Sequence, residues 1–272
     1  MEKIIFNSSL PKCGSELLQV ILHQNPRIYA STTSPLFDFI YGASRNLRNE
    51  ESRSIESDIL HKSFINGCRG MVKGYCETFT DRPIFLDKCR SWSHYYNWIK
   101  EIQTKPKMIC MVRDIRSIVA SFERTYQAHR FSPQCPDDHK TMCNIALKER
   151  VNHYLNSRPL NIALKRLDDL FQTGVSDNIL FVCYEDFCNH SQEMIGKIYE
   201  YLEEEKYVHD FNNIKKVVNE NNSAFGIFGN HQVRKSLNLV GEKPWSDVLN
   251  DDISRNLHNS MINHQNRFKY KL

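Results

Sequence analysis

The N-terminal part of the chain reads Lys3-Ile-Ile-Phe-Asn-Ser-Ser-Leu-Pro-Lys-Cys-Gly-Ser-Glu-Leu-Leu-Gln-Val-Ile-Leu22. A short apolar run predicts a buried strand over Lys3–Asn7, and apolar residues at helical spacing predict a helix over Ser15–His23. The polar loop between them holds Lys12 and Gly14. The N–H groups and the dipole at a helix start favour an anion, a glycine lets the backbone approach it, and a lysine adds positive charge. The sequence therefore predicts a site for a phosphorylated ligand at this loop.

The order of residues in this loop differs from that of the common nucleotide-triphosphate loop. That loop has the pattern G-x-x-x-x-G-K-[ST], in which the lysine follows the second glycine. Here Lys12 precedes Gly14 by two residues, and Glu16 follows Ser15. Taken alone, the segment is also compatible with an ordinary strand, turn and helix that carry a surface lysine.

A second segment repeats the arrangement of strand, polar turn and helix. It reads Lys107-Met-Ile-Cys-Met-Val-Arg-Asp-Ile-Arg-Ser-Ile-Val-Ala-Ser-Phe122 and predicts a strand over Met108–Val112 and a helix over Ile115–Tyr126. Arg113 lies where the strand ends, which is the usual ligand position of an open α/β sheet, and Ser121 lies on the helix that follows. A guanidinium and a hydroxyl at one place suit a phosphate dianion. The alternative is a solvated face of ion pairs formed by four residues, Arg113, Arg116, Asp114 and Glu123.

These two segments resemble the cofactor motifs of sulfotransferases that use 3′-phosphoadenosine 5′-phosphosulfate (PAPS). The pattern Pro-Lys-x-Gly-[Ser/Thr]-x-x-Leu from Pro11 is similar to their 5′-phosphosulfate loop, and Val-Arg-Asp-x-Arg-x-x-Val-x-Ser from Val112 is similar to their 3′-phosphate motif. The resemblance implies that Arg113 and Ser121 hold the 3′-phosphate. It also implies that the loop residues hold the 5′-phosphosulfate. These residues are Lys12, Cys13, Gly14, Ser15 and Glu16, among which Cys13 serves as a spacer.

Three shorter blocks extend the resemblance, which is nearest to the bacterial and protein-tyrosine sulfotransferases. A strand predicted over Ile84–Asp87 is followed by Lys88, which by resemblance approaches the transferring sulfuryl group. The strand predicted over Ile179–Cys183 is followed by Tyr-Glu-Asp, and the resemblance places Tyr184 beside the adenine. In the family a basic loop near the C-terminal end often closes over the nucleotide. The matching residues of this chain are Arg234 and Lys235. The alternative is that these two residues form a solvated basic patch.

The reaction that this resemblance implies is an in-line displacement at sulfur, in which 3′,5′-diphosphoadenosine (PAP) leaves. Like phosphoryl transfer, it depends on positioning and on stabilising charge on oxygen atoms. By resemblance, Lys12 neutralises the leaving phosphate and Lys88 binds the sulfuryl oxygens or the same leaving oxygen.

The acceptor hydroxyl must also lose a proton to a nearby base. In protein-tyrosine sulfotransferases a Glu follows the first helix, but the segment after Asn25-Pro26 of this chain has none in that place. The sequence offers Glu77, which follows an expected strand over Met71–Lys73, and His94, which begins an expected helix. Asp87 is a third alternative, although it is next to Lys88 and an ion pair would explain it equally well.

Composition bounds the class of protein. The chain has 272 residues and a net charge of +4, which is mild for a nucleic-acid-binding protein, so we expect no nucleic-acid partner. No apolar stretch approaches about 18 residues, so we expect no membrane span. The nine cysteines form no C-x-x-C pair and the eleven histidines show no zinc spacing, so we expect reduced thiols, a cytoplasmic location and no metal. Met1 leads directly into the first predicted strand, so we expect no signal or transit peptide.

The organisation that we expect is one α/β domain over residues 1–272, with a mostly parallel sheet between two layers of helices. The resemblance identifies this as the P-loop-NTPase-like sulfotransferase fold. Further helices are expected at Trp92–Ile102, at Ile145–Gln172 with a break or kink at Pro159, and at Gln192–Leu202. The weakly patterned segments 31–69 and 129–148 are expected to form a helical cap on the acceptor side.

Two other functions stay open at this point. A nucleotide kinase or ATPase with a P-loop would need a lysine after Gly14 and an aspartate for magnesium. A non-catalytic module that binds PAP would keep the fold and lack the base. The acceptor would be a hydroxyl compound, either sugar, lipid, small molecule or peptide, because specificity would lie in the unmatched cap. The sequence predicts neither the acceptor nor the oligomeric state.

Overall fold

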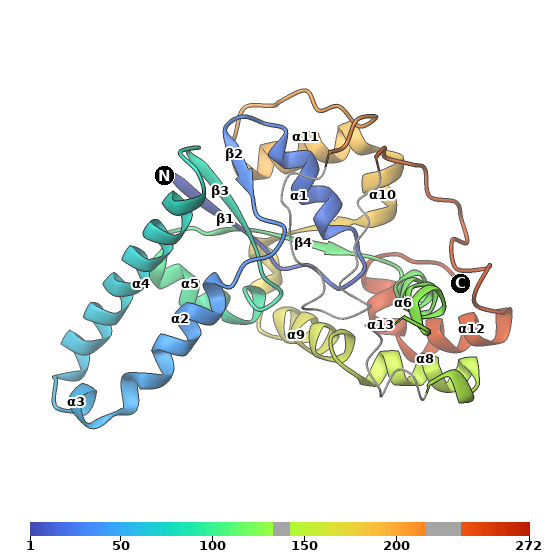
Figure 1. The fold of residues 1–272 in the computed structure, drawn as a ribbon, viewed down its shortest axis with the longest axis horizontal. Coiled ribbons are helices and arrows are strands. Elements are labelled where there is room, and N and C mark those ends of the chain that lie inside the picture. The colour runs from blue at the N-terminus through green and yellow to red at the C-terminus, as the bar shows by residue number, and fades with distance from the viewer. Residues whose placement is uncertain (133–141, 216–234) are drawn as a thin grey trace.

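The computed structural model describes residues 1–132, 142–215 and 235–272 (Figure 1). Its centre is a five-stranded sheet in the order β2-β3-β1-β4-β5, in which all neighbouring strands run parallel. The carboxyl ends of all these strands therefore lie at one edge of the sheet, where open α/β sheets bind their ligands. The strands are β1 (Lys3–Asn7), β2 (Ile28–Ala30), β3 (Ile84–Lys88), β4 (Lys107–Val112) and β5 (Ile179–Cys183).

Helices cover both faces of this sheet and make three layers, as the resemblance implied. Helix α1 (Ser15–His23) lies with α11 (Ser191–Leu202) on one face, whereas α5 (Tyr96–Ile102) and α9 (Leu160–Gln172) lie on the other (Figure 1). The remaining described helices are α2 (Leu36–Arg45), α3 (Glu50–Arg53), α4 (Ser57–Phe79), α6 (Ile115–His129), α8 (Leu147–Asn156), α10 (Tyr184–Asn189), α12 (Asp251–Ser260) and α13 (Ile262–Arg267). Four short 3-10 turns join them, η1 (Asn46–Arg48), η2 (Ser93–Tyr95), η3 (Met142–Asn144) and η4 (Val175–Asn178).

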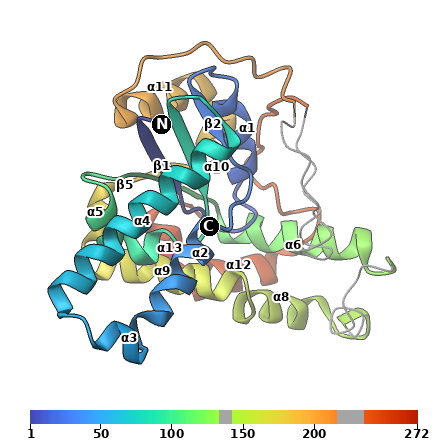
Figure 2. The same cartoon turned by 60° about the vertical axis from the view of Figure 1, so that its left-hand side comes forward.

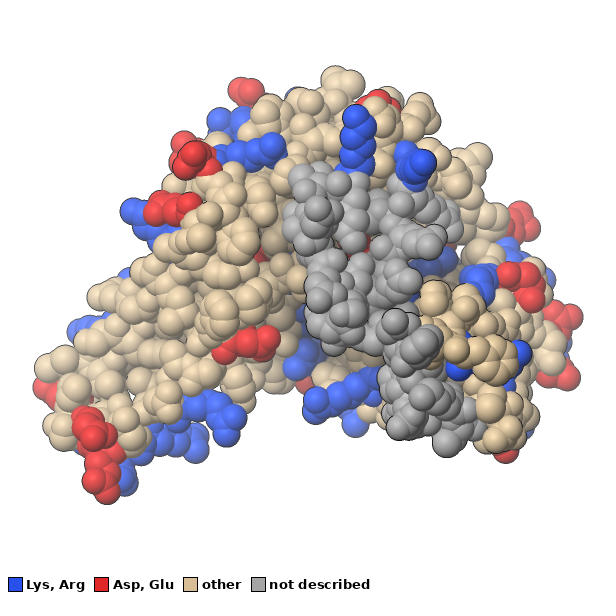
Figure 3. Space-filling model, in the orientation of Figure 1, with Lys and Arg blue, Asp and Glu red and all other residues tan. Residues whose placement is uncertain are grey.

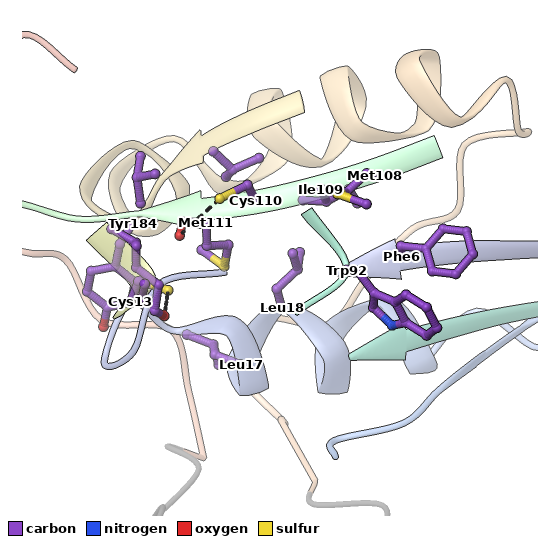
Figure 4. Close-up of a cluster of buried hydrophobic side chains, with 14 of the residues drawn as sticks. Phe6, Cys13, Leu17, Leu18, Trp92, Met108, Ile109, Cys110, Met111 and Tyr184 are labelled. Atoms are coloured by element: carbon purple, nitrogen blue, oxygen red, sulfur yellow. Dashed lines mark hydrogen bonds between the residues drawn. The ribbon is translucent and has the colours of Figure 1, made fainter. Parts of the chain in front are cut away.

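The core lies where α1 packs on the central strands. Leu18 of α1 and Met111 of β4 are fully buried, and both lie in the cluster that Figure 4 shows. Phe6 of β1 packs edge-on against Trp92, with the ring centroids 4.9 Å apart. Apolar contacts on both faces explain why β1 and β4 read as continuous apolar runs in the sequence.

Helices α2, α3 and α4 form an arm that extends away from the sheet on the side of β2 and β3 (Figures 1 and 2). The base of the arm is held by Phe37 of α2, whose ring lies 5.2 Å from that of Trp92 and 5.0 Å from that of Tyr95. The arm includes most of the segment 31–69, which is helical as expected. The second expected cap segment, 129–148, lies partly outside the described residues.

Most of the predicted elements are confirmed. The strand Lys3–Asn7 and the helix Ser15–His23 have the expected bounds. The long helix predicted over Ile145–Gln172 is divided into α8 and α9 around Pro159, the residue at which a break was expected. Proline lacks the N–H that a helix interior needs, which accounts for this division.

One predicted strand is wrong and one short strand was not predicted. Met71–Lys73 lies inside helix α4, because the buried residues of that segment recur at helical and not at alternating spacing, at Ile65, Cys68, Val72 and Cys76. Strand β2 has only three residues, Ile28–Ala30, which is too short for a periodic signal.

Candidate functional site

The loop between β1 and α1 has a backbone conformation that few residue types adopt. Gly14 has φ of 80° and Lys12 has φ of 58°, both in the left-handed region. Gly14 is the residue before the first turn of α1, and it has no side chain with which to cap that turn. A Cβ atom at Gly14 would lie 2.4 Å from Cδ2 of Tyr184, so the ring of Tyr184 leaves room for glycine alone. Left-handed conformations at Lys12 and Gly14 are the kind of backbone strain that clusters at ligand-binding loops.

Lys12 extends from this loop toward helix α6. Its Nζ atom donates to Oγ1 of Thr125 at 3.4 Å and lies 5.8 Å from the centre of the Phe122 ring. Ser121 is on the same helix, and its carbonyl oxygen accepts a hydrogen bond from Oγ1 of Thr125. Burial, and after it the positive charge of Arg90, lowers the pKa of Lys12 to about 8, although the charge of Glu16 acts in the other direction. Part of the 3′-phosphate motif therefore lies beside the 5′ loop.

Arg113 links the two motifs directly. One of its terminal nitrogens donates to the carbonyl oxygen of Lys12 at 2.9 Å, and its guanidinium lies 4.3 Å from the centre of the Tyr184 ring. Its Nε atom is 3.7 Å from Oε1 of Glu185, and 12% of the side chain is exposed. Arg113 thus stabilises the backbone of the loop through Lys12, a role that was not predicted from the sequence.

Tyr184 is buried at the carboxyl end of β5, where it packs against Gly14 and Arg113. It therefore supports the loop, in addition to any contact with the adenine. Lys235 is exposed, and its carbonyl oxygen accepts a hydrogen bond from the N–H of Ile214. Arg234 lies outside the described residues, so the expected basic loop is described at one of its two positions.

Cys13 is fully buried at the centre of the positive charges of this site. Burial raises the pKa of its thiol to about 12, although the charges of Lys88, Arg113 and Arg90 act in the other direction. Its Sγ atom donates to the carbonyl oxygen of Leu10 (Figure 4). A neutral, buried thiol is no nucleophile, which agrees with the spacer role that the resemblance gave to it.

Lys88 is the last residue of β3 and lies next to β1 in the sheet, paired in register with Asn7. Its backbone N–H donates to Oγ of Ser31 at 3.2 Å. Since β1 leads into the loop with Lys12, the neighbouring strand β3 brings Lys88 to the same edge of the sheet. The charge of Lys88 acts to lower the pKa of the Cys13 thiol, which places the two residues near each other. The structure thus brings together Lys12, Lys88 and Arg113 from three different strands.

Of the three residues considered for the base, Glu77 is in the wrong place. It lies on α4, and its Oε1 atom is 3.3 Å from the amino nitrogen of Met1 and 4.0 Å from Nζ of Lys73. Met1 precedes β1, so Glu77 lies at the amino edge of the sheet, opposite the loop of Lys12. The strand that was expected to lead Glu77 to the site, Met71–Lys73, is part of helix α4. Glu77 is therefore not in position to act as the base.

The other two residues lie at the carboxyl edge but in different environments. Asp87 is fully buried, its Oδ2 atom accepts from Nε1 of Trp92 at 2.6 Å, and burial raises its pKa to about 6. His94 lies in η2, its side chain is 44% exposed, and its Nδ1 atom is 3.9 Å from Oδ2 of Asp169. A fully buried carboxyl group cannot touch an acceptor, whereas a half-exposed imidazole can.

Two arginines near these residues, Arg90 and Arg166, were not predicted from the sequence. Arg90 follows Lys88 by two residues, and a terminal nitrogen of Arg166 on α9 lies 3.4 Å from its carbonyl oxygen. The proximity of Arg90 to Lys88 in the sequence was a usable signal. The contribution of Arg166 was not, because no local pattern tells which face of a distant helix meets the turn after β3.

Comparison with known proteins agrees with this geometry. A five-stranded parallel sheet flanked by helices, with a glycine-containing loop between β1 and α1, is the P-loop-like α/β fold. The model of the sulfotransferase family matches residues 5–209, and the chain belongs to that family. Among curated proteins no sequence matches this chain significantly.

Three solved structures share the fold. The sulfotransferase domain from the curacin biosynthetic pathway aligns with a TM-score of 0.55 at 13% identity, over 100% of this chain and 99% of that one. The sulfotransferase domain from the olefin synthase of Synechococcus PCC 7002 gives 0.53 at 16% identity, over 100% and 96%. A sulfotransferase from Alicyclobacillus acidocaldarius gives 0.50 at 13% identity, over 100% and 97%.

The residues that the structure describes contain neither a metal-binding cluster nor a membrane-spanning helix. No group of His, Cys, Asp or Glu side chains there could hold a metal ion. In the same part of the chain no helix is long and apolar enough to cross a membrane.

Proposed function

We propose that this chain transfers a sulfuryl group from PAPS to a hydroxyl acceptor and releases PAP. The observation that carries the proposal is the convergence of Lys12, Lys88 and Arg113 on the buried start of α1. Each of these cations comes from the carboxyl end of a different strand, β1, β3 or β4. A phosphosulfate is a compact, highly charged group, and a helix start with three cations is the arrangement that would bind it.

The donor would lie across β1, β4 and β5. Its 5′-phosphosulfate would meet the N–H groups of Gly14, Ser15 and Glu16 at the start of α1, with Cys13 as the buried spacer. Its 3′-phosphate would meet Arg113 and Ser121, which the contact of Lys12 with α6 brings near the loop. Tyr184, Arg234 and Lys235 are proposed to contact the nucleotide.

The chemical step is a displacement at sulfur. The acceptor oxygen forms a new bond to sulfur while the bond between sulfur and the bridging phosphate oxygen breaks, and the electron pair of that bond leaves with PAP. Lys12 would neutralise the charge that develops on the bridging oxygen, and Lys88 would hold the sulfuryl oxygens in line. These two lysines would stabilise the transition state more than the bound donor, which is what raises the rate.

The acceptor's proton would pass to His94. This residue follows β3 at the carboxyl edge, is half exposed, and faces the carboxylate of Asp169, which would orient its ring. Asp87 lies in the same region but is buried. It would stabilise the turn after β3 by accepting the hydrogen bond from Trp92. The acceptor is proposed to be a hydroxyl-bearing sugar, lipid, small molecule or peptide.

A reducing, cytoplasmic location is part of the proposal, as is a single domain over residues 1–272. The eight cysteines among the described residues are all free thiols, and most of them are buried. Free thiols in this number are typical of proteins that work under reducing conditions.

The catalytic role of Lys88 can be tested by replacing it with alanine. Lys88→Ala should lower kcat about 100-fold or more and change the affinity for PAP less than threefold, because PAP lacks the sulfuryl group that Lys88 would hold. Transfer of labelled sulfate to a panel of hydroxyl acceptors gives kcat, and calorimetry gives the affinity. The exposed Lys100 on α5 provides the control variant, Lys100→Ala. A variant with weaker PAP binding and unchanged kcat would make Lys88 a binding residue only.

A further inference from the structure

The order of strands separates two halves of the carboxyl edge. If the donor lies over β1, β4 and β5, as proposed above, the acceptor must approach over β3 and β2, on the other side of the loop with Lys12. The segment at that place is the turn after β3, from Lys88 to η2. Residues of this turn that the donor does not use are therefore in position to recognise the acceptor.

The turn is held firmly in place. The backbone N–H of Cys89 donates to the carbonyl oxygen of Asn7 at 3.1 Å, which continues the pairing of β3 with β1. Oγ of Ser8 donates to the carbonyl oxygen of Arg90 at 3.0 Å and accepts from the N–H of Ser93 at 3.0 Å. The backbone of Arg90 is thus fixed relative to the loop of Lys12, while the residue is only partly covered and keeps contact with solvent.

Arg166 reaches the same turn from helix α9. One terminal nitrogen lies 3.1 Å from Oγ of Ser91 and 3.4 Å from the carbonyl oxygen of Arg90. Two guanidinium groups are thereby brought to one turn. Burial lowers the pKa of Arg90, and the positive charge of Arg166 acts in the same direction. The thiols of Cys13 and Cys89 act to raise that pKa.

Neither arginine has an acidic partner among the described residues. Of the carboxylates in the region, Asp87 accepts from Trp92 and Asp169 faces His94. Asp38 of α2 is near enough for its charge to act on the thiol of Cys89, but it forms no ion pair with either arginine. Lys12 and Lys88 add positive charge on the donor side, and the charge of Arg90 acts on Lys12. Figure 3 shows Lys and Arg side chains gathered between the arm of α2 to α4 and the helices below the sheet. Positive charge in this excess is favourable when an anion binds.

An aromatic wall lies next to the two arginines. Tyr95 of η2 packs against Tyr41 and Phe37 of the arm, with ring centroids 5.7 Å and 5.0 Å away. Burial raises the pKa of the Tyr95 phenol, and the charge of Arg166 acts to lower it, which places that guanidinium near the ring. A ring-bearing or apolar body beside a charged end would match this surface.

We propose that Arg90 and Arg166 bind an anionic group of the acceptor, so that the natural acceptor is a hydroxyl compound that also carries a carboxylate, sulfate or phosphate. Guanidinium groups bind the planar or tetrahedral oxygens of such groups through paired N–H donors. The anion would lie on the acceptor side of Lys88, and its hydroxyl would then face the sulfuryl group. This inference rests on the proposed donor site for its orientation only.

The test is a set of calorimetric titrations with three matched phenols, 4-hydroxybenzoate, 4-hydroxybenzenesulfonate and the neutral 4-hydroxybenzamide. Each is titrated into the full chain with and without saturating PAP. We expect the charged phenols to bind at least tenfold more tightly than the amide, and Arg90→Gln and Arg166→Gln each to reduce that preference about tenfold. The two charged phenols distinguish a carboxylate site from a site for tetrahedral anions. Lys165→Gln, an exposed neighbour on α9, is the matched control and should change nothing.

The outcomes separate this inference from the donor proposal. Equal binding of the charged and neutral phenols, or a preference that survives both arginine substitutions, would overturn the inference. A loss of PAP affinity in Arg90→Gln, with the phenol preference unchanged, would assign Arg90 to the donor and also overturn it. Failure of the wild-type chain to bind PAP would count against the donor proposal alone, because the phenol preference is also measured without PAP.

Discussion

At the scale of single residues, the site depends on a glycine that has no substitute. Gly14 combines a left-handed backbone with a contact to the ring of Tyr184, and both conditions exclude a side chain. Tyr184 in turn packs on Arg113, which holds the carbonyl oxygen of Lys12. A change at Gly14 would therefore spread to all the residues that are proposed to hold the donor.

Gly14→Ala should destabilise the fold by about 1–3 kcal/mol and weaken PAP binding at least tenfold. Denaturant unfolding and calorimetry measure the two effects. Gly174 offers a matched control, because it has φ of 70° and no atom within 4 Å of an added Cβ. Gly174→Ala should show the backbone strain without the loss of PAP binding. Equal PAP affinity in Gly14→Ala and the wild type would contradict the role of the loop.

Lys12 predicts a pH dependence. Its pKa is lowered to about 8, so the free protein loses this positive charge as the pH rises through 8. PAP is fully ionised on its phosphates above about pH 7, because the second phosphate pKa is about 6. Affinity for PAP should therefore be complete below pH 8 and fall by up to tenfold per pH unit above it. Calorimetry from pH 7 to pH 9.5 measures this, and Lys12→Met should remove the pH dependence. A flat profile in the wild type would show that Lys12 does not contact the bound phosphates.

At the scale of elements, the end of β3 carries a buried charge. Burial raises the pKa of Asp87 from 3.8 to about 6, so the folded chain keeps a proton between these values that the unfolded chain has lost. The contribution of Asp87 to folding stability should therefore fall as the pH rises from about 4 to about 6 and stay level above that range.

Asp87→Asn should remove this fall and stabilise the chain by about 1–3 kcal/mol at pH 7, since the amide oxygen can still accept from Trp92. Urea unfolding at pH 4.5 and pH 7 measures the difference, with Asp81→Asn at an exposed position as the control. A variant that is less stable than the wild type at pH 7 would mean that the nearby cations outweigh the cost of burial.

The elements that sequence could predict are those with long apolar runs or clear helical spacing. β1, β4 and β5 and the helices that follow β1 and β4 fall in this group. Part of α4 resembles a strand in the sequence, because Met71 and Val72 are adjacent apolar residues, whereas the helical signal lies in the wider spacing of Cys68, Val72 and Cys76. Glu77 was placed in the site for the same reason, so one error of periodicity produced two wrong expectations.

At the scale of the whole molecule, the sheet order decides which residues meet. Lys12, Lys88 and Arg113 are far apart in the sequence, yet β1 lies between β3 and β4 and brings them to one edge. The resemblance predicted this meeting from short motifs. Arg166 shows what motifs cannot predict, since its place beside Arg90 results from the packing of α9 beneath the sheet. The acceptor side is built from such distant contacts, and this is why sequence patterns identify the donor class before the acceptor.

The most direct test of the whole account is a calorimetric titration of the chain with PAP, beside ATP with magnesium as the comparison. The account predicts micromolar or tighter binding of PAP and at least tenfold weaker binding of ATP, because Arg113 and Ser121 are proposed to hold a 3′-phosphate that ATP lacks. Binding of ATP with magnesium in preference to PAP, or no binding of PAP, would contradict it.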